Sequence, residues 1–314
     1  MTITNGRIIP PGTDTKEPAP APVRRPSGIG FGRWWWALPA VTLTIVVTYM
    51  ATAFGAFFAF TDWTGLGSFK FVGFDNFVQV FKDPALVGSV RNTLFLAAGY
   101  VVFTNLFGLL FALALNRTLK TRFVLRALIF MPVVLSSVAV SFIWKFVFAF
   151  DGPLNQFLSA VGLDSLKQDW LANPSLALWC ILAVMVWQNI GFVMVIYLAG
   201  LATVPVELEE AAGLDGAGVW QTFTGVVLPT IRPSVAIATV LTLIQGLSVF
   251  DQVLTLTGGG PGDATQTLAS QIYQQTFVYG AFGLGAAAAL VLTVFILVLA
   301  VVQQVVVRDR NNGE

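Results

Sequence analysis

Six long apolar runs, separated by short polar segments, are the feature that most constrains the fold of this chain. Hydrophobic residues make up 56% of its 314 residues and charged residues only 11%, and the mean hydropathy is +0.79. A soluble domain of this length does not carry so much apolar surface, whereas about 20 apolar residues suffice for a helix to cross a bilayer. The sequence therefore predicts an all-α integral membrane protein with six transmembrane helices. The expected spans are residues 34–60, 89–115, 123–150, 174–201, 231–256 and 275–307.

The segments at the two ends differ from the transmembrane domain, residues 34–307. Residues 1–33 are rich in Pro and Gly with scattered charges, a composition that cannot form a core, so this tail is predicted to be disordered and cytoplasmic. Residues 308–314 form a short cytoplasmic C-terminal tail. The run 34–60 is longer than the apolar part of a signal peptide, so it is interpreted as a retained first span. Met131-Pro132 predicts a kink in the third span.

Basic residues indicate the orientation of the chain in the membrane. With the N-terminus in the cytoplasm, 12 of the 17 Lys and Arg residues fall on the cytoplasmic side and five lie outside or near the outer face. Cytoplasmic loops of membrane proteins carry an excess of Lys and Arg. Both termini are therefore expected in the cytoplasm, together with the segment between the fourth and fifth spans.

That segment, residues 203–230, is polar and acidic, and we call it the acidic hairpin. Thr203 and Pro205 are expected to start a first short helix, glycines to break it, and an apolar stripe to mark a second helix before Leu228-Pro229 closes the element. Its acidic residues would be repelled by the negative inner leaflet, which favours docking on a protein. A solvated loop is the alternative. The residues concerned are Glu207, Glu209, Glu210 and Asp215, then Gly213, Gly216 and Gly218, then Trp220, Phe223 and Val227.

The residue types present exclude several kinds of chemistry. The chain has no His and a single Cys, Cys180, in an apolar run, which argues against transition-metal sites, His-based catalytic triads and disulfide frameworks. It has no nucleotide-binding P-loop, and Gly258–Gly262 lacks the Lys of one, so an extracellular turn is expected there. The sequence predicts no catalytic residue and no metal ligand. A net charge of +1 does not suggest nucleic-acid binding.

Polar side chains at membrane depth are costly unless they face protein, water or a ligand, so they are candidate binding residues. Two clusters stand out, one on a single face of the fifth span and one on the fourth. Amides beside an aromatic ring suit a neutral polyhydroxylated solute better than an ion. Hydrogen bonding between packed helices is the alternative. The candidates are Thr242, Gln245, Gly246 and Val249 on the fifth span, and Gln188, Asn189 and Phe192 on the fourth.

Asp251 is the only carboxylate within the fifth span, near its outer end. A proton relay there would point to an ion-coupled secondary transporter. A paired or water-facing gate residue is the other interpretation. The absence of a detectable inverted repeat and the single intramembrane acid argue against the secondary transporter.

The acidic hairpin resembles a known motif. Glu210-Ala211-Ala212, Gly216 after a gap of three residues, and Leu228-Pro229 are similar to the EAA motif of the membrane subunits of bacterial ABC importers. One position departs, because Val226 stands where that family usually has Ile. Asp215-Gly216-Ala217 and the segment 256–261 resemble the carbohydrate-uptake branch, the maltose-type and glycerol-phosphate-type permeases. The similarity extends over residues 34–307.

The resemblance implies a permease subunit that forms half of a pathway for a sugar, with an oligosaccharide expected. Glycerol-3-phosphate or a polyol is the alternative cargo, although a phosphate would favour Arg or Lys near the site. The implied partners are a second homologous permease, two ATPase subunits that carry ATP and Mg, an extracytoplasmic solute-binding protein, and the lipid bilayer of the bacterial plasma membrane. This chain would bind no cofactor and catalyse no reaction.

The resemblance also assigns roles to residues. The acidic hairpin would be the coupling helix that docks on an ATPase subunit, and the two polar clusters match positions that line the mid-membrane sugar site of the maltose-type permease. The docking residues would be Glu210, Ala211, Ala212, Asp215, Gly216, Leu228 and Pro229.

Overall fold

The computed structural model describes residues 36–116 and 120–312. The predicted tail 1–33 lies outside these ranges, as do residues 117–119. The contacts divide the chain into two units, Met1–Ala53 and Phe54–Glu314, and each unit is described by itself. The described part of the first unit contains α1 (Leu38–Thr44), the π-helix η2 (Ile45–Met50) and the beginning of α2 (Ala51–Phe58), whose residues from Phe54 onward belong to the second unit.

The described chain is helical, with one isolated β-bridge between Thr61 and Phe71. Four helical stretches are long and apolar enough to cross a membrane, and two bent helix pairs raise the number to six if each pair is one span. This agrees with the predicted all-α membrane protein. The four stretches are Leu38–Phe58, Pro84–Leu115, Pro174–Leu201 and Phe282–Val305, and the bent pairs are Arg122–Val134 with Ser137–Val147 and Val219–Thr230 with Arg232–Leu247.

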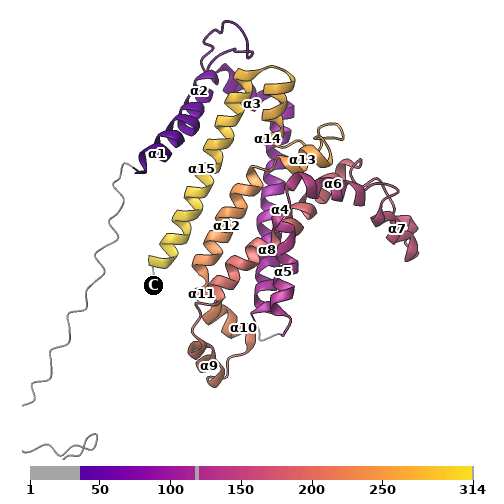
Figure 1. The fold of residues 1–314 in the computed structure, drawn as a ribbon, viewed down its shortest axis with the longest axis vertical. Helices are drawn as coiled ribbons and strands as arrows, with labels where there is room; N and C mark the ends of the chain where they lie inside the picture. Colours follow the sequence, from indigo (N-terminus) through magenta and orange to yellow (C-terminus); the bar gives the residue numbers. More distant parts are fainter. Residues whose placement is uncertain (1–35, 117–119, 313–314) are drawn as a thin grey trace, which may run out of the picture. The chain divides into compact units, whose positions relative to one another are not determined.

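Three helices form the centre of the second unit. The long α4 (Pro84–Leu115) packs along α8 (Pro174–Leu201) and α12 (Arg232–Leu247), as Figure 1 shows. Proline in the first turn and a side-chain cap fix where the two long helices begin: Asp83 accepts from Ala85 N at 2.8 Å, and Asn173 accepts from Ser175 N at 3.0 Å. These caps place the start of the second span at residue 84 rather than 89.

Glycine allows α12 to lie close against α4. A Cβ added at Gly246 would lie only 2.9 Å from the Cα of Ala97, a distance at which the backbone would have to shift. Small residues at such crossings let membrane helices approach and gain van der Waals contact. Gly246, one of the candidate binding residues, therefore packs against α4 in this structure.

The third predicted span is two helices, α5 (Arg122–Val134) and α6 (Ser137–Val147), whose axes differ by 99°. The break lies at Leu135, three residues beyond the Pro132 that was expected to cause it, since α5 continues past the proline. Leu135 has an extended backbone, with φ −77° and ψ 143°, and its carbonyl accepts a hydrogen bond from Gln188 Nε2 at 3.1 Å. A side chain of α8 thus satisfies a carbonyl that the break leaves without a helical partner.

The fifth predicted span is also interrupted. Helix α12 ends at Leu247, and a separate short helix, α13, covers Asp251–Leu256. Thr267 donates its hydroxyl to the carbonyl of Val249 at 3.0 Å, so the intervening backbone has a partner from a distant loop. The hydropathy pattern continues across the break, which is why residues 231–256 looked like one helix.

The predicted glycine turn is part of a folded loop that packs on α4. Positive φ angles at Gly258, Gly259 and Gly262 shape it. Asn92 of α4 donates to the carbonyls of Ala264 and Gln266, at 3.0 and 2.9 Å. The loop is therefore anchored to α4, one of the three central helices.

The sixth predicted span begins later than expected. After α14 (Leu268–Tyr273) and the π-helix η5 (Gln274–Val278), Gly280 adopts a φ of +71°, and the long α15 starts at Phe282 and runs to Asn312. The start predicted at Gln275 is therefore wrong by about two helical turns. The C-terminal residues 308–312, predicted as a tail, continue this helix.

One further short helix lies just before α4. Helix α3 (Asp75–Lys82) packs against α15, and Asn76 at its start donates to the carbonyls of Ala59 and Thr61, at 2.9 and 2.8 Å. These bonds tie α3 to the segment that leaves α2.

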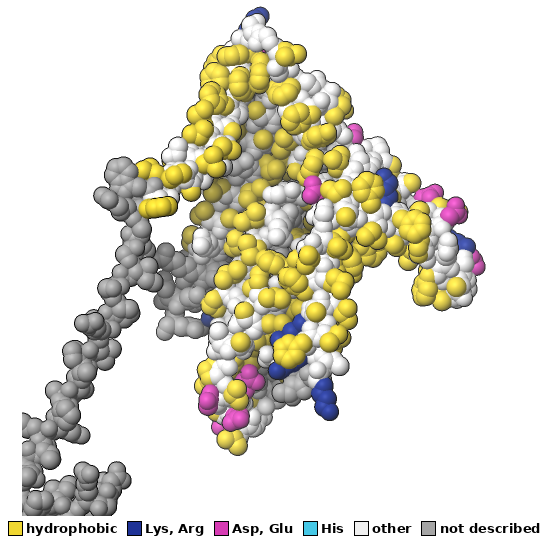
Figure 2. Space-filling view, in the orientation of Figure 1, with side chains coloured by type: hydrophobic (Ala, Val, Ile, Leu, Met, Phe, Trp, Pro, Cys, Tyr) yellow, Lys and Arg dark blue, Asp and Glu magenta, His cyan; other side chains and the backbone are white. Residues whose placement is uncertain are grey.

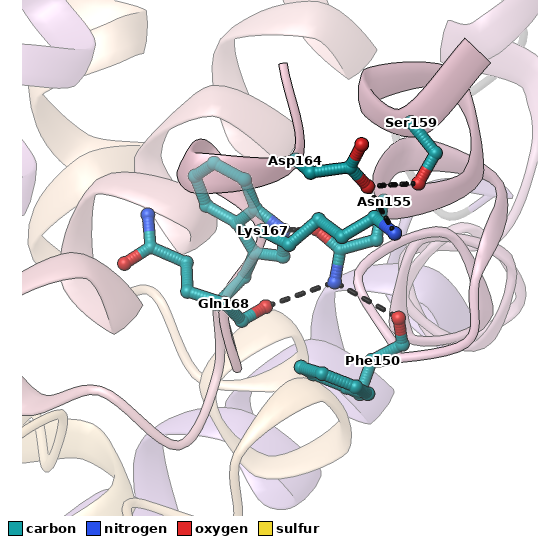
Figure 3. A network of polar contacts seen from close by, with 7 residues as sticks. Phe150, Asn155, Ser159, Asp164, Lys167 and Gln168 are labelled. Carbon is teal, nitrogen blue, oxygen red and sulfur yellow. Dashed lines mark hydrogen bonds and ion pairs between the residues drawn. The ribbon is translucent and has the colours of Figure 1, made fainter. Parts of the chain in front are cut away.

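A small arm between α6 and α8 projects from the helices of the second unit (Figure 1) and consists of α7 (Pro153–Ala160) and the 3-10 turn η3 (Asp164–Leu166). Asn155, only 1% exposed, holds together the segments before and after these helices (Figure 3). Its Nδ2 donates to the carbonyls of Phe150 and Gln168, at 2.9 and 3.0 Å. Its Oδ1 accepts from the Trp170 indole at 2.9 Å.

A second set of contacts closes the tip of the arm. Lys167 forms an ion pair with Asp164 at 2.7 Å, and the Ser159 hydroxyl donates to the same carboxylate at 2.8 Å. The hydrogen bonds from Lys167 and then Ser159 hold the pKa of Asp164 below its usual value. The pair is exposed, so the buried Asn155 carries more of the arm's structure.

Replacing Asn155 with Ala should loosen the arm without changing the central helices. Two carbonyls and the Trp170 indole would lose their partner, a cost of about 1–3 kcal/mol for buried groups. We expect hydrogen exchange in residues 150–170 to become at least about tenfold faster. Gln168→Ala is the matched control, because only the backbone carbonyl of Gln168 bonds to Asn155. Equal exchange in both variants would contradict the role given to Asn155.

Candidate functional site

A cavity of about 330 Å³ opens where α12 is interrupted. Its volume lies at the lower end of the range for small-molecule sites. The walls come from α4, α6, α8, the end of α12, the break after it and α13. The lining residues are Tyr100, Ser137, Met185, Asn189, Gln245, Ser248, Val249, Phe250, Asp251 and Gln252.

The structure brings three of the seven predicted substrate residues to this cavity, namely Asn189, Gln245 and Val249. Gln245 accepts a hydrogen bond from the hydroxyl of Tyr100 through its Oε1, at 2.8 Å. The bond fixes the orientation of the amide and leaves its Nε2, a donor of two protons, without a partner among the described side chains. Tyr100 thus positions the Gln245 amide so that both of its N–H groups can donate into the cavity.

Asn189 has the opposite arrangement. Its Nδ2 donates to the carbonyl of Met185 one turn earlier in α8, at 3.2 Å, which leaves the Oδ1 acceptor available. The cavity therefore presents an amide donor from α12 and an amide acceptor from α8. Polyhydroxylated molecules both donate and accept hydrogen bonds, and such a pair suits them.

Gln188, the neighbour of Asn189, lies behind the cavity wall. It is 4% exposed, and its amide bonds to the break between α5 and α6 and to α13, the helix that follows the second break. Nε2 donates to the carbonyl of Leu135 at 3.1 Å, while Oε1 accepts from Gln252 at 3.3 Å. In this structure Gln188 holds α6 and α13 against α8, and Gln252 is the residue that faces the cavity.

Thr242 belongs to a buried network that links three helices. Asn105 of α4 donates to the Thr242 hydroxyl at 2.9 Å and accepts from the Tyr197 hydroxyl of α8 at 2.8 Å. Thr242 is fully buried, so its contacts are those of the packing alternative. Phe192 is half-buried and packs in the apolar cluster around Met194 and Tyr197.

The sequence did not indicate four polar lining residues as ligand candidates: Tyr100, Ser137, Ser248 and Gln252. A tyrosine or serine in an apolar span gives a weak signal, because such residues commonly bond to their own helix. Gln252 is on α13, and its direction depends on the break that the hydropathy pattern does not show. Asp251, considered as a gate residue, is exposed and lines the cavity.

The Nζ of Lys145 donates to the carbonyl of Thr255 at 3.3 Å, near the end of α13. A cation there suits the negative end of the helix dipole and helps hold α6 beside α13. Lys145 therefore binds near the C-terminal end of α13, whereas Asp251 is the first residue of that helix.

The acidic hairpin contains more pieces than the two predicted helices. Helix α9 (Val206–Leu214) is followed by α10 (Val219–Thr222), the π-helix η4 (Phe223–Val227) and α11 (Leu228–Thr230). Pro205 precedes α9 rather than lying in its first turn, and Thr203 bonds to the carbonyl of Gly200 instead of capping the helix. Leu228-Pro229 continues the helix, and the direction changes by 71° at the junction with α12.

Gly216 makes the corner between α9 and α10, with a φ of +82° that favours glycine. Acidic side chains gather at the tip of the hairpin (Figure 2), and Glu207, Glu209 and Glu210 are all exposed on α9. The apolar Leu214 and Trp220, 90% and 74% exposed, flank the corner. Exposed apolar residues beside acidic ones form a surface suited to a protein partner.

The predicted docking residues are mostly exposed on this hairpin. Ala212 is half-buried, and Ala211, Asp215 and Gly216 are exposed around the corner, while Leu228 and Pro229 are half-buried where the hairpin joins the membrane helices. A groove of about 740 Å³ runs between the hairpin and the end of α4. Its wall includes Glu209, Trp220 and Phe223 from the hairpin and Leu110 and Leu113 from α4.

Within residues 36–116 and 120–312, no group of three or more His, Cys, Asp or Glu residues is placed to hold a metal ion. Cys180 is buried in the apolar cluster around Tyr100 and Ile181.

The Asn105 network can be measured by a double-mutant cycle. Tyr197→Phe and Asn105→Ala each remove one end of the hydrogen bond, so their effects on the free energy of unfolding should couple by about 0.6–1.7 kcal/mol, the range for such bonds in membranes. Thr239→Ala replaces Asn105→Ala in the control cycle, because the Thr239 hydroxyl bonds only to its own helix. A coupling of zero in the first cycle would show that the bond does not stabilise the fold.

Comparisons with known proteins place this architecture. Residues 104–312 match the family described as binding-protein-dependent transport system inner membrane component. The multiple sugar-binding transport system permease of Streptococcus mutans is 35% identical, over 86% of this chain and 93% of its own length.

A probable permease for starch degradation products from Thermoanaerobacterium thermosulfurigenes is 33% identical, over 89% of this chain and 96% of its own length. A bacterial ABC transporter chain involved in importing the acidic polysaccharide alginate has a TM-score of 0.77 at 25% identity, covering 88% of this chain and 94% of that one. These findings support an ABC permease over an ion-coupled transporter. The chain belongs to the inner membrane components of binding-protein-dependent transport systems, the multi-pass, non-catalytic permease subunits of ABC importers, and its relatives are sugar permeases.

Proposed function

We propose that this chain supplies half of a translocation pathway for a sugar, with an oligosaccharide as the expected cargo, and that it works by alternating access. The observation that carries the proposal is the cavity in which Gln245 offers a positioned donor and Asn189 an acceptor, at a break between α12 and α13. A helix break lets polar backbone and side chains meet a solute inside the membrane. The named cargoes of two relatives, multiple sugars and starch degradation products, support the same class.

The proposed assembly contains a second, homologous permease, two ATPase subunits that hold ATP and Mg, and an extracytoplasmic binding protein. The second permease would supply the opposite wall of the cavity. Both termini and the acidic hairpin would lie in the cytoplasm of a bacterial cell, as the distribution of Lys and Arg indicates. This chain would hold no cofactor.

The acidic hairpin would dock on an ATPase subunit. Its exposed acidic residues and the apolar Leu214 and Trp220 offer charge and apolar contact on one tip. The hairpin joins α12, whose far end carries Gln245, through the bend after α11. Closure of the ATPase pair would move the hairpin, and α12 would transmit the movement to the cavity. The sugar must bind the two states with different affinity for the cycle to be directed.

Gly216→Val should uncouple the ATPase from sugar. Valine is strained at a φ of +82°, so the corner between α9 and α10 would change shape. We expect sugar-stimulated ATP hydrolysis of the assembled complex to fall at least about tenfold, a change that 1–2 kcal/mol of strain can produce.

Gly213→Ala is the control for that variant. Gly213 lies inside α9, and a Cβ there would meet no atom within 4 Å. The control should keep full stimulation, since alanine favours the helix. Full stimulation in Gly216→Val as well would refute a coupling role for the corner.

Gln245→Ala should weaken the interaction with sugar. The variant loses one hydrogen bond worth about 1 kcal/mol. We therefore expect the sugar concentration needed for half-maximal uptake to rise about fivefold to tenfold. Ile237→Ala on the same helix does not touch the cavity and serves as control. Uptake that is equally sensitive to both variants would place the sugar elsewhere.

Glycerol-3-phosphate is the second candidate cargo. A phosphate is bound in proteins by Arg, Lys or helix N-termini. Among the described residues that line the cavity there is no Lys and no Arg, and the one charged residue is an acid. The chemistry of this wall therefore favours the sugar.

A further inference from the structure

The charge of the cargo is left open by the family, because one solved relative imports an acidic polysaccharide. The cavity of this chain contains chemistry that bears on the question. Its one charged lining residue is Asp251, at the beginning of α13, with an exposed side chain. Among the described residues, no Lys or Arg forms an ion pair with Asp251, and no hydrogen bond from another group reaches its carboxylate.

The neutral lining groups both donate and accept. Asn189 uses one N–H to bond to Met185 and keeps its second N–H and its Oδ1. Gln252 uses one N–H to bond to Gln188 and keeps its second N–H and its Oε1. Gln245 keeps both N–H groups of its amide, because Tyr100 bonds to its oxygen instead. These amides carry no charge, so the carboxylate of Asp251 determines how the wall acts on charged groups.

Such a wall fits hydroxyl groups and ammonium groups, which can donate to it, and it repels carboxylates, sulfonates and phosphates. We infer that this cavity selects neutral or amino-bearing saccharides over anionic ones, and that Asp251 is the residue that sets this preference. The inference rests on the proposed sugar pathway and adds the charge class of the cargo and a specificity-determining residue.

Asp251 has a structural alternative, because a carboxylate in the first turn of a helix stabilises the helix dipole. A contribution to the helix dipole changes the stability of the protein, whereas the field of the carboxylate in the cavity changes the discrimination between charged molecules that enter it. The test therefore measures charge preference rather than stability. Lys145 lies at the other end of α13, where it bonds to the carbonyl of Thr255, and it is the cation that a complete test must account for.

The probes are two thiol reagents of similar size, a cationic and an anionic methanethiosulfonate. They react with a cysteine placed at Ser248 in the cavity, in the assembled complex with Cys180→Ser as background. The ratio of cationic to anionic rates, divided by the same ratio for a free thiol, reports the local potential. We expect this normalised ratio to be about ten. That corresponds to a difference of roughly 1.4 kcal/mol between the interactions of the cationic and the anionic reagent with Asp251.

Asp251→Asn should bring the ratio close to that of the free thiol. Asp263→Asn is the matched control, because it removes an exposed acid from the loop after α13 that does not line the cavity, at a φ of +61° that Asn tolerates. The control should keep the full ratio. A wild-type ratio of one, or a ratio unchanged by Asp251→Asn, would overturn the inference. Lys145→Met should raise the ratio further if its charge offsets that of Asp251.

Cellobiose and cellobiouronic acid, which differ only in one CH₂OH or carboxylate, provide the matching binding measurement by equilibrium dialysis. Retention of cellobiose at least about tenfold above the acid, with the difference lost in Asp251→Asn, agrees with the inference. Equal retention by the wild type contradicts it. If the complex retains neither disaccharide, the thiol ratio alone decides. Loss of sugar-stimulated ATP hydrolysis under all conditions would instead reject the proposed function, and the thiol ratio would still report the cavity charge.

Discussion

Every backbone polar group inside an apolar environment needs a partner, and this constraint governs the whole second unit. Continuous helices meet it by themselves, but the third and fifth apolar spans are interrupted, between α5 and α6 and between α12 and α13. Side chains from distant segments supply the missing partners: Gln188 bonds to Leu135, and Thr267 bonds to Val249. Asn92 does the same for the loop that follows α13. Polar side chains of this apolar chain therefore serve to give hydrogen-bond partners to backbone carbonyls at the helix breaks and in the adjoining loop.

The breaks also create the site. Helix α13 is separate from α12, and the cavity at the break between them is lined by residues of five helices and of the break itself. A single straight fifth helix would direct Asp251 and Gln252 elsewhere. The same helix α12 reaches the acidic hairpin at its other end, where Gly216 forms the exposed corner. The cavity and the hairpin thus lie at opposite ends of α12. A movement of the hairpin can therefore shift the residues of α12 that line the cavity.

Hydropathy was enough to predict the helical class and the approximate spans, because bilayer thickness requires long apolar runs. It could not predict the breaks at Leu135 and after Leu247, because the few polar residues there, Ser136 and Ser137 or Ser248 and Asp251, do not interrupt the apolar runs. The same limit explains the candidate site. Gln188 and Asn189 are adjacent in sequence but about 100° apart around α8, so one fills the interior and the other faces the cavity. Which one does so depends on the position of α6, which the break sets.

Alternating access is the central claim, and side-specific labelling of the cavity tests it most directly. A cysteine at Ser248, in the Cys180→Ser background, would be treated with a membrane-impermeant thiol reagent in sealed vesicles that contain the complete complex. The account predicts labelling from the cytoplasmic face without nucleotide, and from the outer face when ATP is bound but not hydrolysed. Labelling from the same face in both states would contradict it.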